Sequence, residues 1–200
     1  MAGDPNPRAD SERRSRLPLL GLALVAALLV VAGVGVALVN RSPAPKPAVS
    51  GKSTTIDGLA SYTGLGSEHV KGAVKYEQSP PVGGDHSPVW ENCGWYDAVV
   101  PNEQAVHSME HGAVWVTYDP ALGEADKAAL KHELSGTDYV VASPYPGLPG
   151  PVVASAWGKQ VVLDSATDPR LAAFVKAFAG TDNAPEMDAS CTDGAGTPTG

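Results

Sequence analysis

Residues 113–120 read AVWVTYDP, and this stretch decides the fold class. It is β-branched and aromatic and ends at Asp-Pro, which is typical of a buried strand that runs into a turn. Further along the chain, similar runs predict strands over 139–142, 152–157 and 160–163, the last two joined by Gly158-Lys159 in a hairpin. The C-terminal half therefore contains the sheet.

Two helices are predicted among these strands. The first covers residues 124–134. The second begins after Thr167 or Asp168, which can cap it, and has Pro169 at its first position. An apolar stripe then faces the core, formed by Leu171, Phe174, Val175 and Phe178. The pattern predicts an α+β fold with a small mixed sheet and two helices.

The part that precedes the strand is rich in glycine and proline. Residues 64–72 (GLGSEHVKG) and 79–88 (SPPVGGDHSP) favour loops and short strands over helices. We expect this loop-rich segment to pack on the sheet within one domain, residues 56–191, which is long enough for one core. Residues 192–200 are polar and glycine-rich and are predicted to form a disordered tail.

An uninterrupted apolar run covers residues 19–39. Its 21 residues suffice for a transmembrane helix, whereas the apolar region of a signal peptide usually has about 7–15. The sequence therefore predicts a single-pass membrane protein, although a cleaved signal peptide would place the same domain outside. Residues 1–18 form a basic tail, and residues 40–55, rich in Pro, Ser and Ala, form a linker.

The charge distribution predicts the orientation in the membrane and excludes one class of partner. Four arginines precede the apolar run, so the N-terminus is expected in the cytoplasm and the domain outside the cell membrane. Residues 53–200 contain 7 Lys or Arg and 19 Asp or Glu, a net charge of 7 − 19 = −12. Such a surface repels phosphate backbones, so we expect no nucleic-acid partner. Nothing in the sequence identifies a protein partner.

The chain has two cysteines, Cys93 and Cys191, both C-terminal to the apolar run. An oxidising compartment allows them to form one structural disulfide, and their separation excludes a C-x-x-C redox motif. Two free thiols are the alternative.

Four of the five histidines fall in two stretches, and this clustering is the main functional signal. His69 and His86 lie in the loop-rich segment, while His107 and His111 lie in VHSMEHG. Imidazole is the commonest protein ligand for metals, and two histidines four residues apart share one face of a helix. Glu110, between them, is suited to bind the metal or to orient an imidazole.

Several motifs together resemble the bacterial DUF3105 family over about residues 56–191. They are HVKG (69–72), Tyr76, PPVGGDH (80–86), Trp90, CGWY (93–96), VHSMEHGAV (106–114), AWG (156–158) and Pro185-Glu186. The family pattern has Thr, Ser and Pro where this chain has Val82, Gly83 and Asp85, which leaves the geometry of that loop open.

The resemblance implies a domain of unknown function, often found behind one membrane anchor. Carried over residue by residue, the resemblance leaves His132 outside the motifs. It singles out five candidate ligands: His69, His86, His107, Glu110 and His111. We expect these residues to bind copper or zinc. A buried, metal-free hydrogen-bond network with Trp90 and Trp95, in a structural or interaction module of the cell envelope, is the alternative.

A catalytic interpretation is also available. Residues 107–111 read H-x-x-E-H, the inverzincin order, in which two histidines bind zinc and the glutamate is the general base; Glu186 is a possible third ligand. That motif belongs inside a continuous helix, whereas Gly112 follows at once and a strand is predicted from Ala113. The sequence therefore favours a binding domain over a metal-dependent hydrolase.

The predicted topology has a direct test. Protease added to intact protoplasts should remove the C-terminal domain and leave the N-terminal tail protected, because the arginines before residue 19 keep that tail inside. A fully protected domain together with a digested tail would show that the orientation is reversed.

Overall fold

The computed structural model describes residues 55–200. The predicted tail and transmembrane helix, and the linker up to residue 54, lie outside the described residues. Within residues 55–200, no helix combines the length and the apolar character that crossing a membrane requires.

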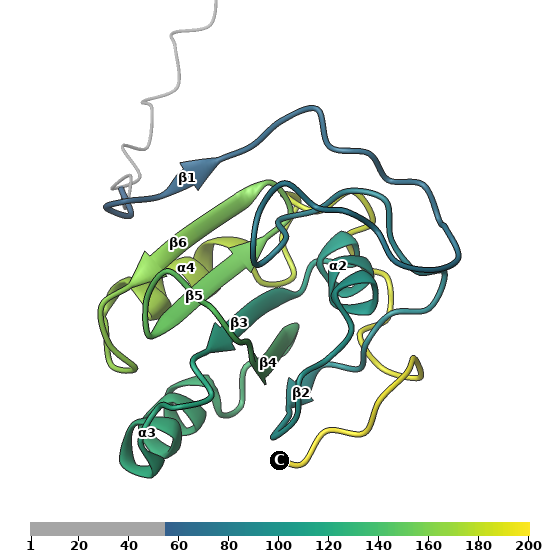
Figure 1. Ribbon diagram of the computed structural model, residues 1–200. Helices are drawn as coiled ribbons and strands as arrows, with labels where there is room; N and C mark the ends of the chain where they lie inside the picture. The colour runs from purple at the N-terminus through teal and green to yellow at the C-terminus, as the bar shows by residue number, and fades with distance from the viewer. Residues whose placement is uncertain (1–54) are drawn as a thin grey trace, which may run out of the picture. The chain divides into compact units, whose positions relative to one another are not determined.

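A mixed six-stranded sheet organises the domain, in the order β1-β6-β5-β3-β4-β2 (Figure 1). β3 pairs in parallel with β4, which also pairs in parallel with β2, whereas the other neighbours are antiparallel. The strands are β1 (Ala60–Ser61), β2 (Gly94–Trp95), β3 (Val114–Tyr118), β4 (Val140–Pro144), β5 (Val152–Ala156) and β6 (Lys159–Leu163). The four longer strands lie where the sequence predicted strands, and the β5–β6 hairpin is confirmed.

The described residues contain three helices, not the two predicted. α3 (Glu124–Leu134) and α4 (Arg170–Phe178) confirm the expected helices, and the Asp168 carboxylate accepts the backbone N–H of Arg170 at the start of α4. The unexpected helix is α2 (Asn102–Glu110). Its apolar face is short, consisting of Ala105, Val106 and Met109, and its buried surface also includes His107, Ser108 and Glu110, so a search for hydrophobic periodicity misses it. The α+β class is confirmed.

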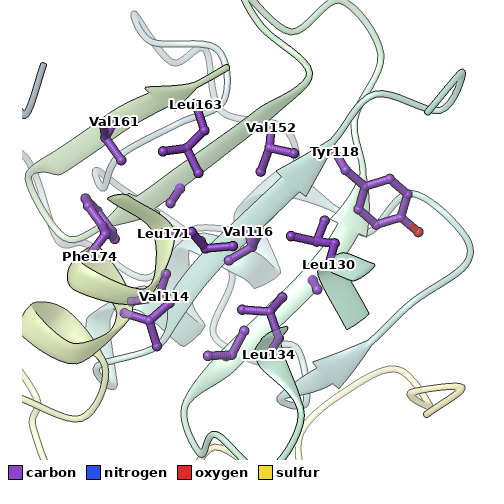
Figure 2. Packing of buried hydrophobic residues seen from close by; sticks show 14 of the residues in the cluster. Val114, Val116, Tyr118, Leu130, Leu134, Val152, Val161, Leu163, Leu171 and Phe174 are labelled. Carbon is purple, nitrogen blue, oxygen red and sulfur yellow. The ribbon is translucent and has the colours of Figure 1, made fainter. Parts of the chain in front are cut away.

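Alternating side chains of the central strand β3 serve two cores on opposite faces of the sheet. Val114, Val116 and Tyr118 pack with α3 and α4 (Figure 2). Trp115 belongs to a second cluster on the other face, together with Val106 and Met109 of α2. α2 is thus separated by the sheet from α3 and α4, and it forms the base on which the loop-rich segment lies.

The loop-rich segment, residues 62–92, contains no long strand but is fixed to the domain by backbone hydrogen bonds. Tyr62 N–H donates to the Gly158 carbonyl, and Gly158 N–H donates to Val82. Ser87 N–H and Glu91 N–H donate to carbonyls of the first turn of α2. These bonds attach the segment to both the β5–β6 hairpin and α2, and Figure 1 shows the segment running past α2.

Residues 192–200 do not form the disordered tail that was predicted. Ala195 forms a parallel bridge with Glu91, and Thr199 N–H donates to the Trp95 carbonyl. β2 is a two-residue strand at the edge of the sheet, and the tail satisfies backbone groups that this edge would otherwise leave unpaired. The tail contributes mainly backbone atoms to these contacts, several of them with the side chain of Asn92, so the polar composition of the tail gave no sign of them.

The predicted disulfide between Cys93 and Cys191 is confirmed. It joins residues 98 positions apart and lies beside a backbone hydrogen bond between the same two residues. The two chain segments next to the histidines are therefore linked covalently.

Replacing both cysteines with alanine should lower the free energy of unfolding by up to about 4–5 kcal/mol, because the unfolded chain regains the entropy of a long open loop. Urea unfolding of the two proteins measures the difference. Adding a reductant should destabilise the wild type and leave the double variant unchanged. Recovery of two alkylatable thiols from the native wild type would contradict the disulfide.

Candidate metal centre

The C-terminal end of α2 places three polar side chains beside one another. His107 and Glu110 lie in its last turn, and His111 is its C-cap. Gly112 then adopts a φ of +103°, which only glycine accepts readily. A Cβ atom at this position would contact the backbone of Gly180. Because this residue ends the helix abruptly, α2 and β3 are separated by only three residues, and the polar end of α2 is held against the central strand.

His69 and His86 reach α2 from the loop-rich segment. They form an isolated parallel bridge, in which Val70 N–H donates to the His86 carbonyl and His86 N–H donates to that of Glu68. The bridge places their rings 4.8 Å apart, measured between centroids. The loop that differs from the family pattern at Val82, Gly83 and Asp85 still delivers His86 to the cluster.

Four of the five predicted ligands converge. One ligand atom from each of His69, His86, His107 and Glu110 lies within 4.8 Å of every other. His86, His107 and Glu110 are buried, whereas the His69 side chain is 45% exposed. The cluster is therefore a largely buried site that His69 connects to solvent.

The closest contact in this cluster is between two atoms that lack a hydrogen bond. His86 Nε2 and Glu110 Oε2 are 2.9 Å apart, and both are buried. Neither atom has a hydrogen-bond partner within the described residues. Two buried polar atoms left in this state are costly, unless a cation satisfies both.

The other ring nitrogens show which atoms are free to bind a cation. His86 Nδ1 is 2.8 Å from the Gly84 carbonyl oxygen, and His107 Nδ1 is 2.6 Å from that of Ser87. A carbonyl oxygen only accepts, so we assign the proton of each neutral ring to Nδ1. The lone pairs of both Nε2 atoms then face the cluster. This pattern, with a backbone acceptor behind each ring, is the usual support of a metal-binding histidine.

His111 has the same support but lies outside the group of four. Its Nδ1 donates to the Ser190 carbonyl at 2.6 Å, and its Nε2 is 2.9 Å from His107 Nε2 and 3.7 Å from Glu186 Oε2. His111 is thus adjacent to the four residues and faces Glu186. His132 lies on α3, as the sequence predicted, with no link to the cluster.

A family comparison matches residues 69–193 to the family described as "Protein of unknown function (DUF3105)". The chain belongs to the DUF3105 family. The matched region begins at His69 and includes all five predicted ligands, Glu186 and both cysteines. Comparison with curated proteins and with solved structures gave no match.

In this DUF3105 domain, the residues that sequence reasoning missed act through their backbone. Gly84, Ser87 and Ser190 orient three imidazoles with carbonyl oxygens, and no side-chain pattern announces such a role. Trp90 does contribute a side chain, since its ring lies 4.8 Å from that of His111 and its Nε1 donates to the Thr192 carbonyl. Trp95, which the metal-free alternative placed in the network, instead stacks on Tyr118.

The helix context does not match that of an inverzincin. His107 and His111 occupy the last turn and the C-cap of a nine-residue helix. Glu110 turns toward His86 and His69, as a ligand would, and the downstream Glu186 lies near His111. The end of α2 also presents the negative pole of the helix dipole to the cluster, which favours a cation there.

Burial is the main reason that the pKa of His107 is lowered to about 4, and the neighbouring His111, His86 and His69 add to the effect. The hydrogen bond to the Ser87 carbonyl acts in the opposite direction and raises the pKa of His107. The folded protein therefore binds fewer protons at His107 than the unfolded chain, whose pKa is about 6.5. The contribution of the neutral His107 ring to the free energy of unfolding is therefore fully present above about pH 6.5. This contribution is lost as the pH falls toward 4.

In the presence of a chelator, the free energy of unfolding should fall by about 3 kcal/mol between pH 7.5 and pH 4 through His107 alone, given its lowered pKa. Urea unfolding across this range measures the loss. His107→Gln removes the titrating group and should reduce the pH dependence, whereas His132→Gln should not. An equal pH dependence in the wild type and His107→Gln would contradict the assignment.

Proposed function

We propose that the domain binds one transition-metal ion, Zn(II) or Cu(II), through His69, His86, His107 and Glu110. The observation that carries this proposal is the 2.9 Å contact between His86 Nε2 and Glu110 Oε2, two buried atoms without a hydrogen bond. A bound cation satisfies both atoms and compensates the buried carboxylate charge. The ligand atoms lie up to 4.8 Å apart, so the most distant pair must close by about 1.4 Å to reach the ~3.4 Å that separates ligands of a tetrahedral zinc ion with bonds of ~2.1 Å.

The donor set narrows the choice of metal. All four donors are imidazole nitrogens or a carboxylate oxygen, which suit Zn(II) and Cu(II). The thioether of Met109, which is adjacent in sequence and would favour Cu(I), is buried in the apolar cluster with Val106 and Trp115. Both cysteines are in the disulfide, so they supply no thiolate. These donors argue against a copper(I) site.

Binding an ion here also has a structural consequence. His69 and His86 belong to the loop-rich segment, whereas His107 and Glu110 belong to α2. An ion shared by the four residues cross-links two parts of the chain that are otherwise joined by a few backbone hydrogen bonds. We therefore propose a binding domain in which the ion also orders the fold, and we assign no turnover to it.

We propose further that the domain is held outside the cytoplasm by a single transmembrane helix over residues 19–39. The length of the apolar run and the four arginines before it support this location. The disulfide agrees with an oxidising compartment.

The metal-free network is the competing function, and the geometry argues against it. A network stabilises when its members are hydrogen-bonded, and a partly satisfied network costs free energy. The His86–Glu110 contact leaves two members unsatisfied at its centre. The network alternative would require a hydrogen bond at this contact.

Calorimetric titration of the chelator-treated full chain in detergent tests metal binding. The wild type should bind Zn(II) or Cu(II) at this site, and His86→Ala and Glu110→Gln should weaken that binding at least ~100-fold because each removes a ligand. Affinity should also weaken as the pH falls toward 4, since His107 must be neutral to bind and its pKa is lowered to about 4.

His132→Ala is the matched control, because His132 lies on the surface helix α3 and should leave the affinity unchanged. Absence of stoichiometric binding by the wild type, with either metal, would contradict the proposed function.

A further inference from the structure

Beside the four clustered residues lies a second set of donor atoms that the proposed site leaves unused. His111 is buried, and its Nε2 is 3.7 Å from Oε2 of Glu186, a side chain that is 53% exposed. Glu186 is held in place through its backbone, since its N–H donates to the Glu110 carbonyl at 3.0 Å. The C-terminal segment thus brings a carboxylate to the rim of the histidine cluster.

The contact between His107 and His111 joins two ring nitrogens at hydrogen-bond distance. The two Nε2 atoms are 2.9 Å apart. Each ring uses its Nδ1 proton to bond a backbone carbonyl, that of Ser87 or Ser190. With both protons on Nδ1, two neutral rings direct lone pairs at each other, and either an added proton or a metal cation between them makes the contact favourable.

The five candidate ligands and Glu186 therefore divide into two similar triads. In the first triad, Glu110 lies 2.9 Å from His86 and 3.6 Å from His69. In the second, His111 lies 2.9 Å from His107 and 3.7 Å from Glu186. Each triad has two imidazoles and one carboxylate, a donor set that recurs in protein metal sites.

Distances favour dividing the ligands between two ions. Donors on one zinc ion are separated by at most ~4.2 Å, twice the bond length of ~2.1 Å. The group of His69, His86, His107 and Glu110 extends to 4.8 Å, and His111 lies outside it. One ion cannot reach all these atoms without movement. With His107 assigned to the second triad, Glu110 and His111 each lie 2.9 to 3.7 Å from the other two members of their triads.

We propose that the cluster is a two-ion centre, with one divalent ion on His69, His86 and Glu110 and a second on His107, His111 and Glu186. Ions in two-metal sites lie ~3.5–4 Å apart, which fits neighbouring triads that share one cluster. The inference rests on the proposed function for its first ion, transfers His107 from that ion to a second one, and has His111 and Glu186 as the distinctive ligands of the second ion. The exposed side chains, His69 and Glu186, lie on different triads, so both ions are accessible from solvent.

Stoichiometry tests the inference with the full chain in detergent. After chelator treatment, titration with zinc chloride followed by elemental analysis should give two zinc ions per wild-type chain. Glu186→Gln and His111→Ala should each reduce the number to one, and circular dichroism checks that both variants are folded. Glu133→Gln, on exposed α3, is the matched control for Glu186→Gln and should keep two ions.

A second measurement does not depend on variants. With two equivalents of Cu(II), the wild type should show the dipolar or exchange coupling of two nearby copper ions in its electron paramagnetic resonance spectrum. Glu186→Gln with one equivalent should show an isolated copper signal.

The outcomes separate the two proposals. One zinc ion per wild-type chain, or two ions retained by both Glu186→Gln and His111→Ala, overturns the two-ion centre and leaves the single site standing. No bound zinc or copper in the wild type overturns both.

Discussion

The abrupt end of α2 at Gly112 is the constraint on which the rest of the site depends. A helix whose buried face is polar is unusual, and this one is fixed because β3, the central strand, begins two residues later. The short connection prevents His107, Glu110 and His111 from turning toward solvent. The fold therefore keeps the charge and the lone pairs of these side chains inside the domain. Burying them costs free energy, and contacts with the rest of the cluster offset that cost.

The cluster is assembled from segments with few regular contacts of their own. His69 and His86 meet through a single bridge, and each buried imidazole is supported by a carbonyl oxygen from a neighbouring loop. Such segments have little hydrophobic area to hold them, so their order depends on specific polar contacts. This explains why a domain with a well-packed sheet has its functional residues in the part that is least regular.

The sequence predicted the sheet well because β3 to β6 are apolar and β-branched, and it predicted α4 from the signal at Asp168 and Pro169 that begins this helix. It missed α2 because Ser108 and Glu110 are buried where apolar residues are expected. It identified the four clustered candidate ligands from residue type, spacing and the family resemblance. Sequence could not show that His111 faces Glu186 rather than joining those four, because this depends on how the chain near Ser190 returns to α2. Nor could the sequence show which backbone carbonyls accept hydrogen bonds from the imidazoles, because every residue has a backbone carbonyl.

The return of the C-terminal segment to α2 has a consequence for the order of events during biosynthesis. Glu186 bonds the backbone of Glu110, and Ser190 orients His111, so these contacts form only after residues about 75–80 positions further along the chain have been made. A ribosome adds these residues in a few seconds. During that interval the histidines of α2 lack their final neighbours. His111 therefore meets Glu186 only after the C-terminal segment has been synthesised and has closed on α2, whereas His69, His86 and Glu110 are all present much earlier.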